Sequence, residues 1–306
     1  LYEMVFGTGR SGKYDVVYDV PEKGEVVEAT VVRAKNGVVV NYVEDYMRRR
    51  DPDCMRIGDD KPTDKPRFAD VYGFPFADMK KQTLDWLKSQ ELIFMPFNSG
   101  GNVYGYGSML ICPRNAAFFA FALAHLQGFV SAEETEGYEP RAIVYVAPPF
   151  RHTHFNGKQV VVHNRLDNCH EVFSYNLYPG PSAKKGVYSV LLDIGEQEDW
   201  VTAHASAARL TTQYDNELVI MHEGASGGGK SEMLQDVART EDGRVLLSEN
   251  TVTGEKTLLN LGRTAMIEPV CDDMATCYPK LQTGSGKLAL VTVELDWLLR
   301  MDGGTH

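Results

Sequence analysis

The residues of this sequence that are best suited to chemistry begin with one glycine-rich segment. Residues 224–231 read GASGGGKS, which fits the pattern G-x-x-x-x-G-K-[ST]. In such a loop the glycines let successive backbone N–H groups turn toward a phosphate, the lysine reaches the β- and γ-phosphates, and the serine hydroxyl binds Mg²⁺. The pattern therefore predicts that the chain binds a nucleoside triphosphate. The predicted nucleotide-binding residues are Gly224, Ala225, Ser226, Gly227, Gly228, Gly229, Lys230 and Ser231.

A pair of carboxylates, Asp272 and Asp273, is the second feature with chemical potential. It directly follows Cys271 and an apolar run at residues 266–270 that is typical of a strand. Two aspartates after a strand often form a turn. Beside a phosphate loop, however, they are suited to bind the divalent cation that accompanies a triphosphate.

A phosphate loop needs a strand before it and a helix after it. Residues 217–222 are expected to form the strand and residues 230–239 the helix. Apolar spacing predicts further helices over residues 83–92 and 116–126, and the aromatic residues of the second are expected to pack in the core. Apolar and β-branched runs predict strands at 16–20, 38–43, 143–146, 159–163, 187–192, 216–222, 245–248, 257–261, 266–270 and 288–295. This pattern predicts a mixed α/β fold with much antiparallel sheet.

Composition excludes several classes of protein. The chain has 306 residues, 43% hydrophobic and 24% charged, which is typical of a globular protein of about two domains. Its net charge of −11 disfavours nucleic acid and anionic membranes as partners, and no apolar run is long enough to cross a bilayer. Its five scattered cysteines, none in CxxC spacing, indicate reduced thiols and a cytoplasmic location.

Four separated segments together resemble ATP-type phosphoenolpyruvate carboxykinase, in that family's order. Residues 8–15 (TGRSGKYD) resemble the segment whose arginine, here Arg10, holds the substrate's carboxylate or phosphate. Residues 183–189 (AKKGVYS) and 203–207 (AHASA) resemble the segments whose lysine and histidine bind the catalytic metal. The phosphate loop and the aspartate pair resemble the two kinase motifs of the family.

The resemblance implies a metal site and a set of catalytic residues. Lys185, His204 and Asp273 would bind the first metal, usually Mn²⁺, with the lysine as a neutral amine. Ser231 would bind a second metal, Mg²⁺ or Mn²⁺, with Asp272 a further ligand or an adjacent group. The implied catalytic residues are Arg10, Lys185, Lys230 and Ser226.

The implied reaction is the decarboxylation and phosphorylation of oxaloacetate. The metal polarises oxaloacetate, loss of CO₂ leaves an enolate, and the enolate oxygen attacks the γ-phosphate of ATP, or of GTP, to give phosphoenolpyruvate. The resemblance also implies a carboxykinase-like fold, with a substrate-binding domain over residues 1–199. A phosphate-loop domain would span residues 200–306 and be truncated at its C-terminus.

The chain departs from the family at several points, which keeps other functions open. Gly12 replaces a proline, Ala183 replaces a methionine, and residues 245–261 are expected to form an additional β-hairpin. The loop followed by Glu232 is also similar to HPr kinase, so a phosphotransferase of that type is one alternative. A non-catalytic nucleotide-binding regulatory module is another. The combination of Arg10, Lys185 and His204 favours the carboxykinase, since a protein kinase needs no second metal site. A second lysine pair at residues 77–81 (ADMKK) lacks a histidine at the matching distance.

Overall fold

The structure of the chain, a computed structural model, describes residues 1–8, 11–34, 37–42, 52–225, 228–234, 240–260, 262 and 265–294. Its contacts divide these residues into two compact units, Leu1–Glu198 and Asp199–Glu294. The division falls beside the boundary predicted between residues 199 and 200. The substrate and nucleotide roles of the two parts stay predictions.

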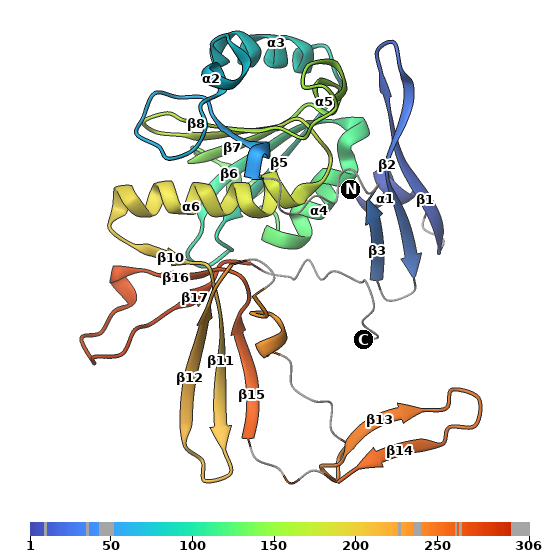
Figure 1. The fold of residues 1–306 in the computed structure, drawn as a ribbon, viewed down its shortest axis with the longest axis vertical. Coiled ribbons are helices and arrows are strands. Elements are labelled where there is room, and N and C mark those ends of the chain that lie inside the picture. Colours follow the sequence, from blue (N-terminus) through green and yellow to red (C-terminus); the bar gives the residue numbers. More distant parts are fainter. Residues whose placement is uncertain are drawn as a thin grey trace. The chain divides into compact units, whose positions relative to one another are not determined.

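The first unit is built on a six-stranded mixed sheet in the order β4-β8-β9-β7-β6-β5 (Figure 1). β6, β7 and β9 run parallel, whereas β5 is antiparallel to β6 and β8 to β9. The mixed α/β class is therefore confirmed. The strands are β4 (Met55–Ile57), β5 (Leu92–Ser99), β6 (Tyr106–Pro113), β7 (Ala142–Val146), β8 (Val161–Arg165) and β9 (His170–Ser174). The α-helices are α1 (Tyr2–Phe6), α2 (Phe68–Tyr72), α3 (Phe76–Lys88), α4 (Ala117–Gln127), α5 (Pro148–Thr153) and α6 (Lys185–Glu198).

A separate three-stranded sheet belongs to the same unit. β1 (Gly12–Val20), β2 (Gly24–Ala34) and β3 (Gly37–Tyr42) pair antiparallel in chain order. The strands predicted at residues 16–20 and 38–43 lie in β1 and β3, except that residue 43 lies outside the described residues. β2 was not predicted.

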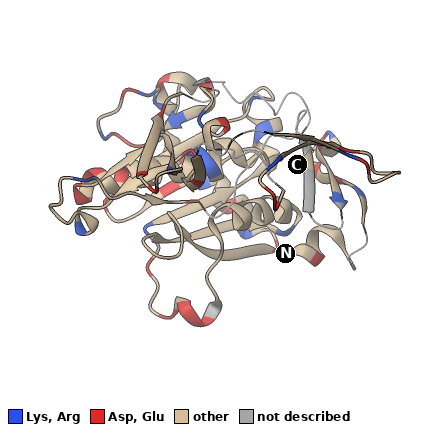
Figure 2. Cartoon of the chain, turned by 90° about the horizontal axis from the view of Figure 1, so that it is seen from below, with Lys and Arg blue, Asp and Glu red and all other residues tan. Residues whose placement is uncertain are grey.

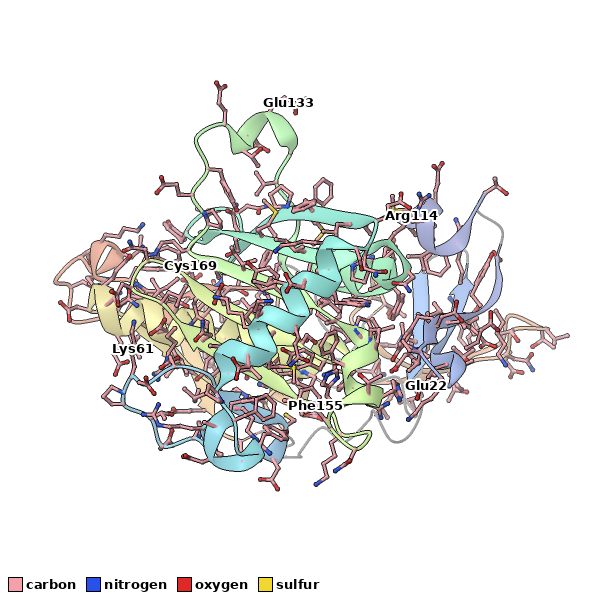
Figure 3. All side chains as sticks on the ribbon, turned by 90° about the horizontal axis from the view of Figure 1, so that it is seen from above. Glu22, Lys61, Arg114, Glu133, Phe155 and Cys169 are labelled. Atoms are coloured by element: carbon pink, nitrogen blue, oxygen red, sulfur yellow. The ribbon has the colours of Figure 1, made fainter. Side chains whose placement is uncertain are left out.

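Aromatic side chains fill much of the core of the first unit. The ring of Phe173 on β9 lies 5.1 Å from that of Phe76 on α3 and 4.7 Å from that of Tyr145 on β7. Phe155, labelled in Figure 3, lies 4.9 Å from Tyr175. Each such pair stabilises the fold by about 0.5–1.5 kcal/mol beyond the burial of its area.

α4 confirms the helix predicted at residues 116–126. It ends at Gly128, whose φ of 72° is a conformation that glycine adopts at little cost. Phe118, Phe119 and Phe121 are all buried, so the prediction that they pack in the core is confirmed. Because residues are buried on almost every side of this helix, it is a core helix rather than a surface one.

The strand predicted at residues 187–192 is wrong, because these residues lie in α6. The buried residues of α6 include Val187, Val190, Leu191 and Ile194. Their spacing of three and four places them on one face of a helix. A short apolar run with β-branched residues does not by itself distinguish a strand from such a helix.

The second unit consists, over its described residues, of small antiparallel sheets in the orders β12-β11-β15, β10-β16-β17 and β13-β14. The hairpin predicted within residues 245–261 is confirmed by the β13–β14 pair. β17 is much shorter than the strand predicted at 288–295. The strands are β10 (Val201–Ala203), β11 (Ala205–Thr212), β12 (Glu217–Glu223), β13 (Val245–Glu249), β14 (Lys256–Leu259), β15 (Ala265–Cys271), β16 (Ala275–Cys277) and β17 (Val291–Thr292).

The helix predicted at residues 230–239 is described only in part. Its described section forms a short 3₁₀ helix, η6 (Glu232–Leu234), and residues 235–239 lie outside the described residues.

Acidic and basic residues are interspersed along the chain, as the view of Figure 2 shows. No helix formed by the described residues is both long and apolar enough to cross a bilayer. All five cysteines carry free thiols.

Candidate functional site

Two connections between strands of the second unit lie side by side and bring His204 next to Asp273. His204 joins β10 to β11, and residues 272–274 join β15 to β16. β10 pairs with β16 on one side of these connections, and β11 pairs with β15 on the other, both antiparallel. The pairing on both sides holds the two connections against each other, although they are far apart in the sequence.

The phosphate loop is the third segment at this point. β12 ends at Glu223, opposite Ala205 of β11, so the strand predicted before the loop is confirmed. The loop then begins beside His204, because the Gly224 N–H donates to the His204 carbonyl at 3.3 Å. Near its end Gly229 has a φ of 85°, a left-handed conformation that favours glycine.

Lys230, the lysine of the loop, is buried, with 6% of its side chain exposed. Its Nζ donates to the carbonyl oxygens of Gly224 at 3.0 Å and Ala225 at 3.3 Å. The same Nζ lies 3.4 Å from Asp273 Oδ1. A buried ammonium group needs such partners, so the loop and Asp273 together make this position possible for a lysine.

Asp273 contacts two residues through the same oxygen. The His204 ring donates from Nε2 to Oδ1 at 2.8 Å, and Lys230 faces that oxygen as well. The φ of Asp273 is 61°, in the left-handed region that aspartate and asparagine adopt more readily than most residues. The sharp turn that this conformation makes after β15 positions the carboxylate between His204 and the loop.

Asp272 is held in a different way, by the last residue of the loop. The Ser231 hydroxyl lies 2.9 Å from Asp272 Oδ1 and 3.0 Å from Oδ2. Asp272 is buried, as is the preceding Cys271. Burial raises the pKa of the Cys271 thiol to about 11, with a smaller contribution from the Asp272 carboxylate, so the thiol is neutral near pH 7. The Asp272 carboxylate and the Ser231 hydroxyl are therefore the groups at this point that can offer oxygen atoms to a cation.

Ser206 contacts the loop although the sequence did not single it out as a site residue. Its side chain is fully buried, and its hydroxyl donates to the Lys230 carbonyl at 2.9 Å. A possible signal was present, because Ser206 is a hydroxyl-bearing residue between Ala205 and Ala207 in a buried strand. Nothing in that pattern, however, indicates which group the hydroxyl meets.

The donor atoms of this site are of kinds that bind divalent cations. His204 Nε2 and Asp273 Oδ1, 2.8 Å apart, are hydrogen-bonded to each other, so a cation bound by both would have to replace that hydrogen bond. Imidazole, carboxylate and hydroxyl groups suit Mn²⁺ and Mg²⁺. No group of three or more His, Cys, Asp or Glu among the described residues is arranged to hold a metal.

Four other predicted site residues, Lys185, Arg10, Ser226 and Gly227, are not among the described residues of the second unit. Lys185 belongs to the first unit, where it begins α6 and its Nζ lies 5.8 Å from the ring centre of Tyr188. Arg10, Ser226 and Gly227 lie outside the described residues. The second unit thus brings together His204, Lys230, Ser231, Asp272 and Asp273.

Comparison with known proteins gives a family but no described relative. A search of curated proteins found no match to the chain. The model of one family, described as "Domain of unknown function (DUF4914)", matches residues 1–306. The chain therefore belongs to the DUF4914 family.

Proposed function

We propose that this chain is a phosphoenolpyruvate carboxykinase-like enzyme that uses a nucleoside triphosphate and divalent metal ions to convert oxaloacetate into phosphoenolpyruvate. One observation carries the nucleotide and metal part of the proposal. His204, the end of the phosphate loop and the Asp272–Asp273 pair come from three distant stretches of chain and meet through hydrogen bonds and an ion pair. The choice of oxaloacetate rests on the resemblance of the four segments.

The loop supplies the groups that bind the triphosphate. Lys230 carries its ammonium group inside the loop, where a phosphate can replace the carbonyls of Gly224 and Ala225 as its partner. Ser231 presents its hydroxyl beside Asp272, which suits the cation that accompanies the phosphates. ATP is the proposed nucleotide, with GTP as a second possibility to be compared directly.

His204 and Asp273 are the proposed protein ligands of the catalytic metal, together with Lys185 from the first unit. When bound, this metal supplies a Lewis acid that stabilises the enolate formed from oxaloacetate. The Asp273 carboxyl group lies beside both the imidazole of His204 and the ammonium group of Lys230. Arg10 is proposed to bind the substrate carboxylate and Ser226 to lie near it. The first unit would hold the substrate, the second the nucleotide, and the protein would be cytoplasmic.

An HPr kinase-like phosphotransferase is a second candidate, and one observation favours it. The described residues that meet at the loop belong to the second unit, and such a kinase needs nothing more for its metal and nucleotide. Glu232, which directly follows Ser231, is a further point of similarity to HPr kinase. A regulatory module that binds nucleotide without chemistry requires even fewer of these residues.

Purified protein separates these functions in two measurements. ATP and GTP binding with Mg²⁺ and Mn²⁺ is measured by calorimetry, and turnover of oxaloacetate is measured by coupled detection of phosphoenolpyruvate. The carboxykinase requires that Lys185→Met abolish turnover while leaving nucleotide affinity within about twofold. Lys81→Met is the matched control, because Lys81 ends the other lysine pair and lies on the exposed surface of α3 in an ion pair with Asp85. Nucleotide binding without turnover of oxaloacetate, under any nucleotide or metal, would reject the carboxykinase.

A further inference from the structure

We propose that Ser206 is a positioning residue of the nucleotide site. Its hydroxyl holds the Lys230 carbonyl and thereby fixes the end of the phosphate loop in the orientation that binds a triphosphate. This inference rests on the proposed function, because it adds a residue to the same nucleotide site.

The surroundings of Ser206 leave its hydroxyl with a structural task. Ser206 is 0% exposed, and the neighbouring Ala205, Ala207 and Ala208 on β11 are buried as well. A buried hydroxyl without a partner is destabilising, so this one requires an acceptor. Its acceptor is the Lys230 carbonyl at 2.9 Å. Lys230 is distant in the chain from β11, because β12 and most of the loop lie between them.

The Lys230 carbonyl in turn depends on this contact. In a regular α-helix it would accept from the N–H four residues later. Here the Leu234 N–H donates to the Ser231 carbonyl instead, at 3.2 Å. The Met233 N–H lies 3.2 Å from the carbonyls of both Gly229 and Lys230 and is shared between them. The hydrogen bond from the Ser206 hydroxyl to the Lys230 carbonyl is therefore shorter than the one from the Met233 N–H. It takes the place of the helical hydrogen bond that the Leu234 N–H would donate.

This contact controls two side chains that would touch the nucleotide. The Lys230 carbonyl belongs to the peptide plane that joins Lys230 to Ser231, so a rotation of that plane moves both residues. The Lys230 side chain is held at its far end by Gly224, Ala225 and Asp273. Ser206 holds its main chain at the other end. Phosphate replaces the partners of the side chain but not the contact from Ser206. With the main chain fixed by Ser206, the end of the loop does not have to lose that freedom when phosphate binds, which strengthens binding.

The test combines variants at Ser206 with two readouts on the full chain. Ser206→Ala and Ser206→Cys remove the hydroxyl, whereas Ser206→Thr keeps one. Thr202→Val is the matched control, because Thr202 has a buried hydroxyl 3.3 Å from that of Thr276, between β10 and β16 of the same unit. Hydrogen exchange of residues 228–234 without nucleotide reports the anchoring, and calorimetry with ATP and Mg²⁺ reports binding.

We expect Ser206→Ala and Ser206→Cys to speed exchange of the loop amides and to weaken ATP binding about tenfold, the effect typical of one lost buried hydrogen bond. Ser206→Thr should restore both, and Thr202→Val should change neither by more than about twofold. If either Ser206→Ala or Ser206→Cys does not fold, the other of the two is compared with Thr202→Val. Unchanged exchange and unchanged ATP affinity in a folded hydroxyl-free variant would overturn the inference. If the wild-type chain itself fails to bind ATP or GTP, the proposed function fails and this inference with it. If the hydroxyl-free variants exchange faster but bind ATP as tightly as the wild type, the Ser206 contact is structural only and the positioning role is overturned.

Discussion

The ion pair between Lys230 and Asp273 can be measured without any ligand, by a double-mutant cycle of folding stability. The cycle compares Lys230→Met, Asp273→Asn and the double variant with the wild-type chain. Asp273→Asn leaves a buried ammonium group with only two carbonyl partners, whereas Lys230→Met leaves a carboxylate that still accepts from His204. The double variant has neither buried charge, so it should be less unstable than the two single effects together.

The expected coupling follows from the geometry. Two unit charges 3.4 Å apart attract each other by about 5 kcal/mol at an effective dielectric constant of about 20. The desolvation of both groups opposes this attraction, and the loop carbonyls partly replace Asp273. We therefore expect Asp273→Asn to lower the free energy of unfolding by about 3 kcal/mol and Lys230→Met by about 2 kcal/mol. The double variant should be about 2 kcal/mol more stable than their sum.

Urea unfolding, followed by circular dichroism at one pH and one salt concentration, gives the four free energies of unfolding. The exposed pair of Arg209 and Glu268 on β11 and β15, with Nε 2.6 Å from Oε2, provides a control cycle. Its coupling should not exceed about 0.5 kcal/mol, as is usual for exposed ion pairs. If the Lys230 and Asp273 effects add within about 0.5 kcal/mol, the two charges are not paired in the nucleotide-free protein and the description of the site is wrong.

Three further outcomes are expected. His204→Asn should weaken Mn²⁺ binding, followed by electron paramagnetic resonance, by about 10- to 100-fold, and an unchanged affinity would remove His204 from the metal site. Asp272→Asn should weaken ATP binding in calorimetry more with Mg²⁺ than without it, because Asp272 holds the Ser231 hydroxyl. Burial lowers the pKa of His163 well below its usual range, with smaller effects from His170 and Arg165. The unfolded imidazole protonates near pH 6.5 while the folded one stays neutral, so the free energy of unfolding should fall below about pH 6.5, and His163→Asn should flatten this dependence in urea titrations.

The sequence predicted those parts of the fold in which local pattern and packing agree. α4 was predicted because its apolar run is long enough for a buried helix, and the structure has one. α6 was misread as a strand because the run at residues 187–192 was considered by itself, whereas the helical spacing of Val187, Val190, Leu191 and Ile194 extends beyond it. β11 was not predicted at all, because its residues Ala205, Ala207 and Ala208 have little β-propensity and are in a strand only through pairing with β12 and β15.

The site was predictable in its residue types and partly in its grouping. The loop pattern and the aspartate pair identified Lys230, Ser231, Asp272 and Asp273, and the structure brings these together with His204. What the sequence could not supply is the register of β11 with β15, because register depends on contacts between distant strands. The contact of a buried hydroxyl on β11 with the loop depends on the same register.

The left-handed backbone of Asp273 has a consequence for which residues this position tolerates. A φ of 61° strongly disfavours β-branched and bulky side chains, which leaves glycine, asparagine and aspartate as the natural choices. Of these three, only aspartate is negatively charged. In a saturation library scored for abundance and for activity, every substitution that removes the negative charge at this position loses the ion pair with Lys230, but Asn and Gly should be better tolerated for abundance than β-branched or bulky residues and should still fail for activity. This position thus has two independent requirements, a left-handed backbone and a negative charge, and among the twenty amino acids aspartate is the one that best meets both.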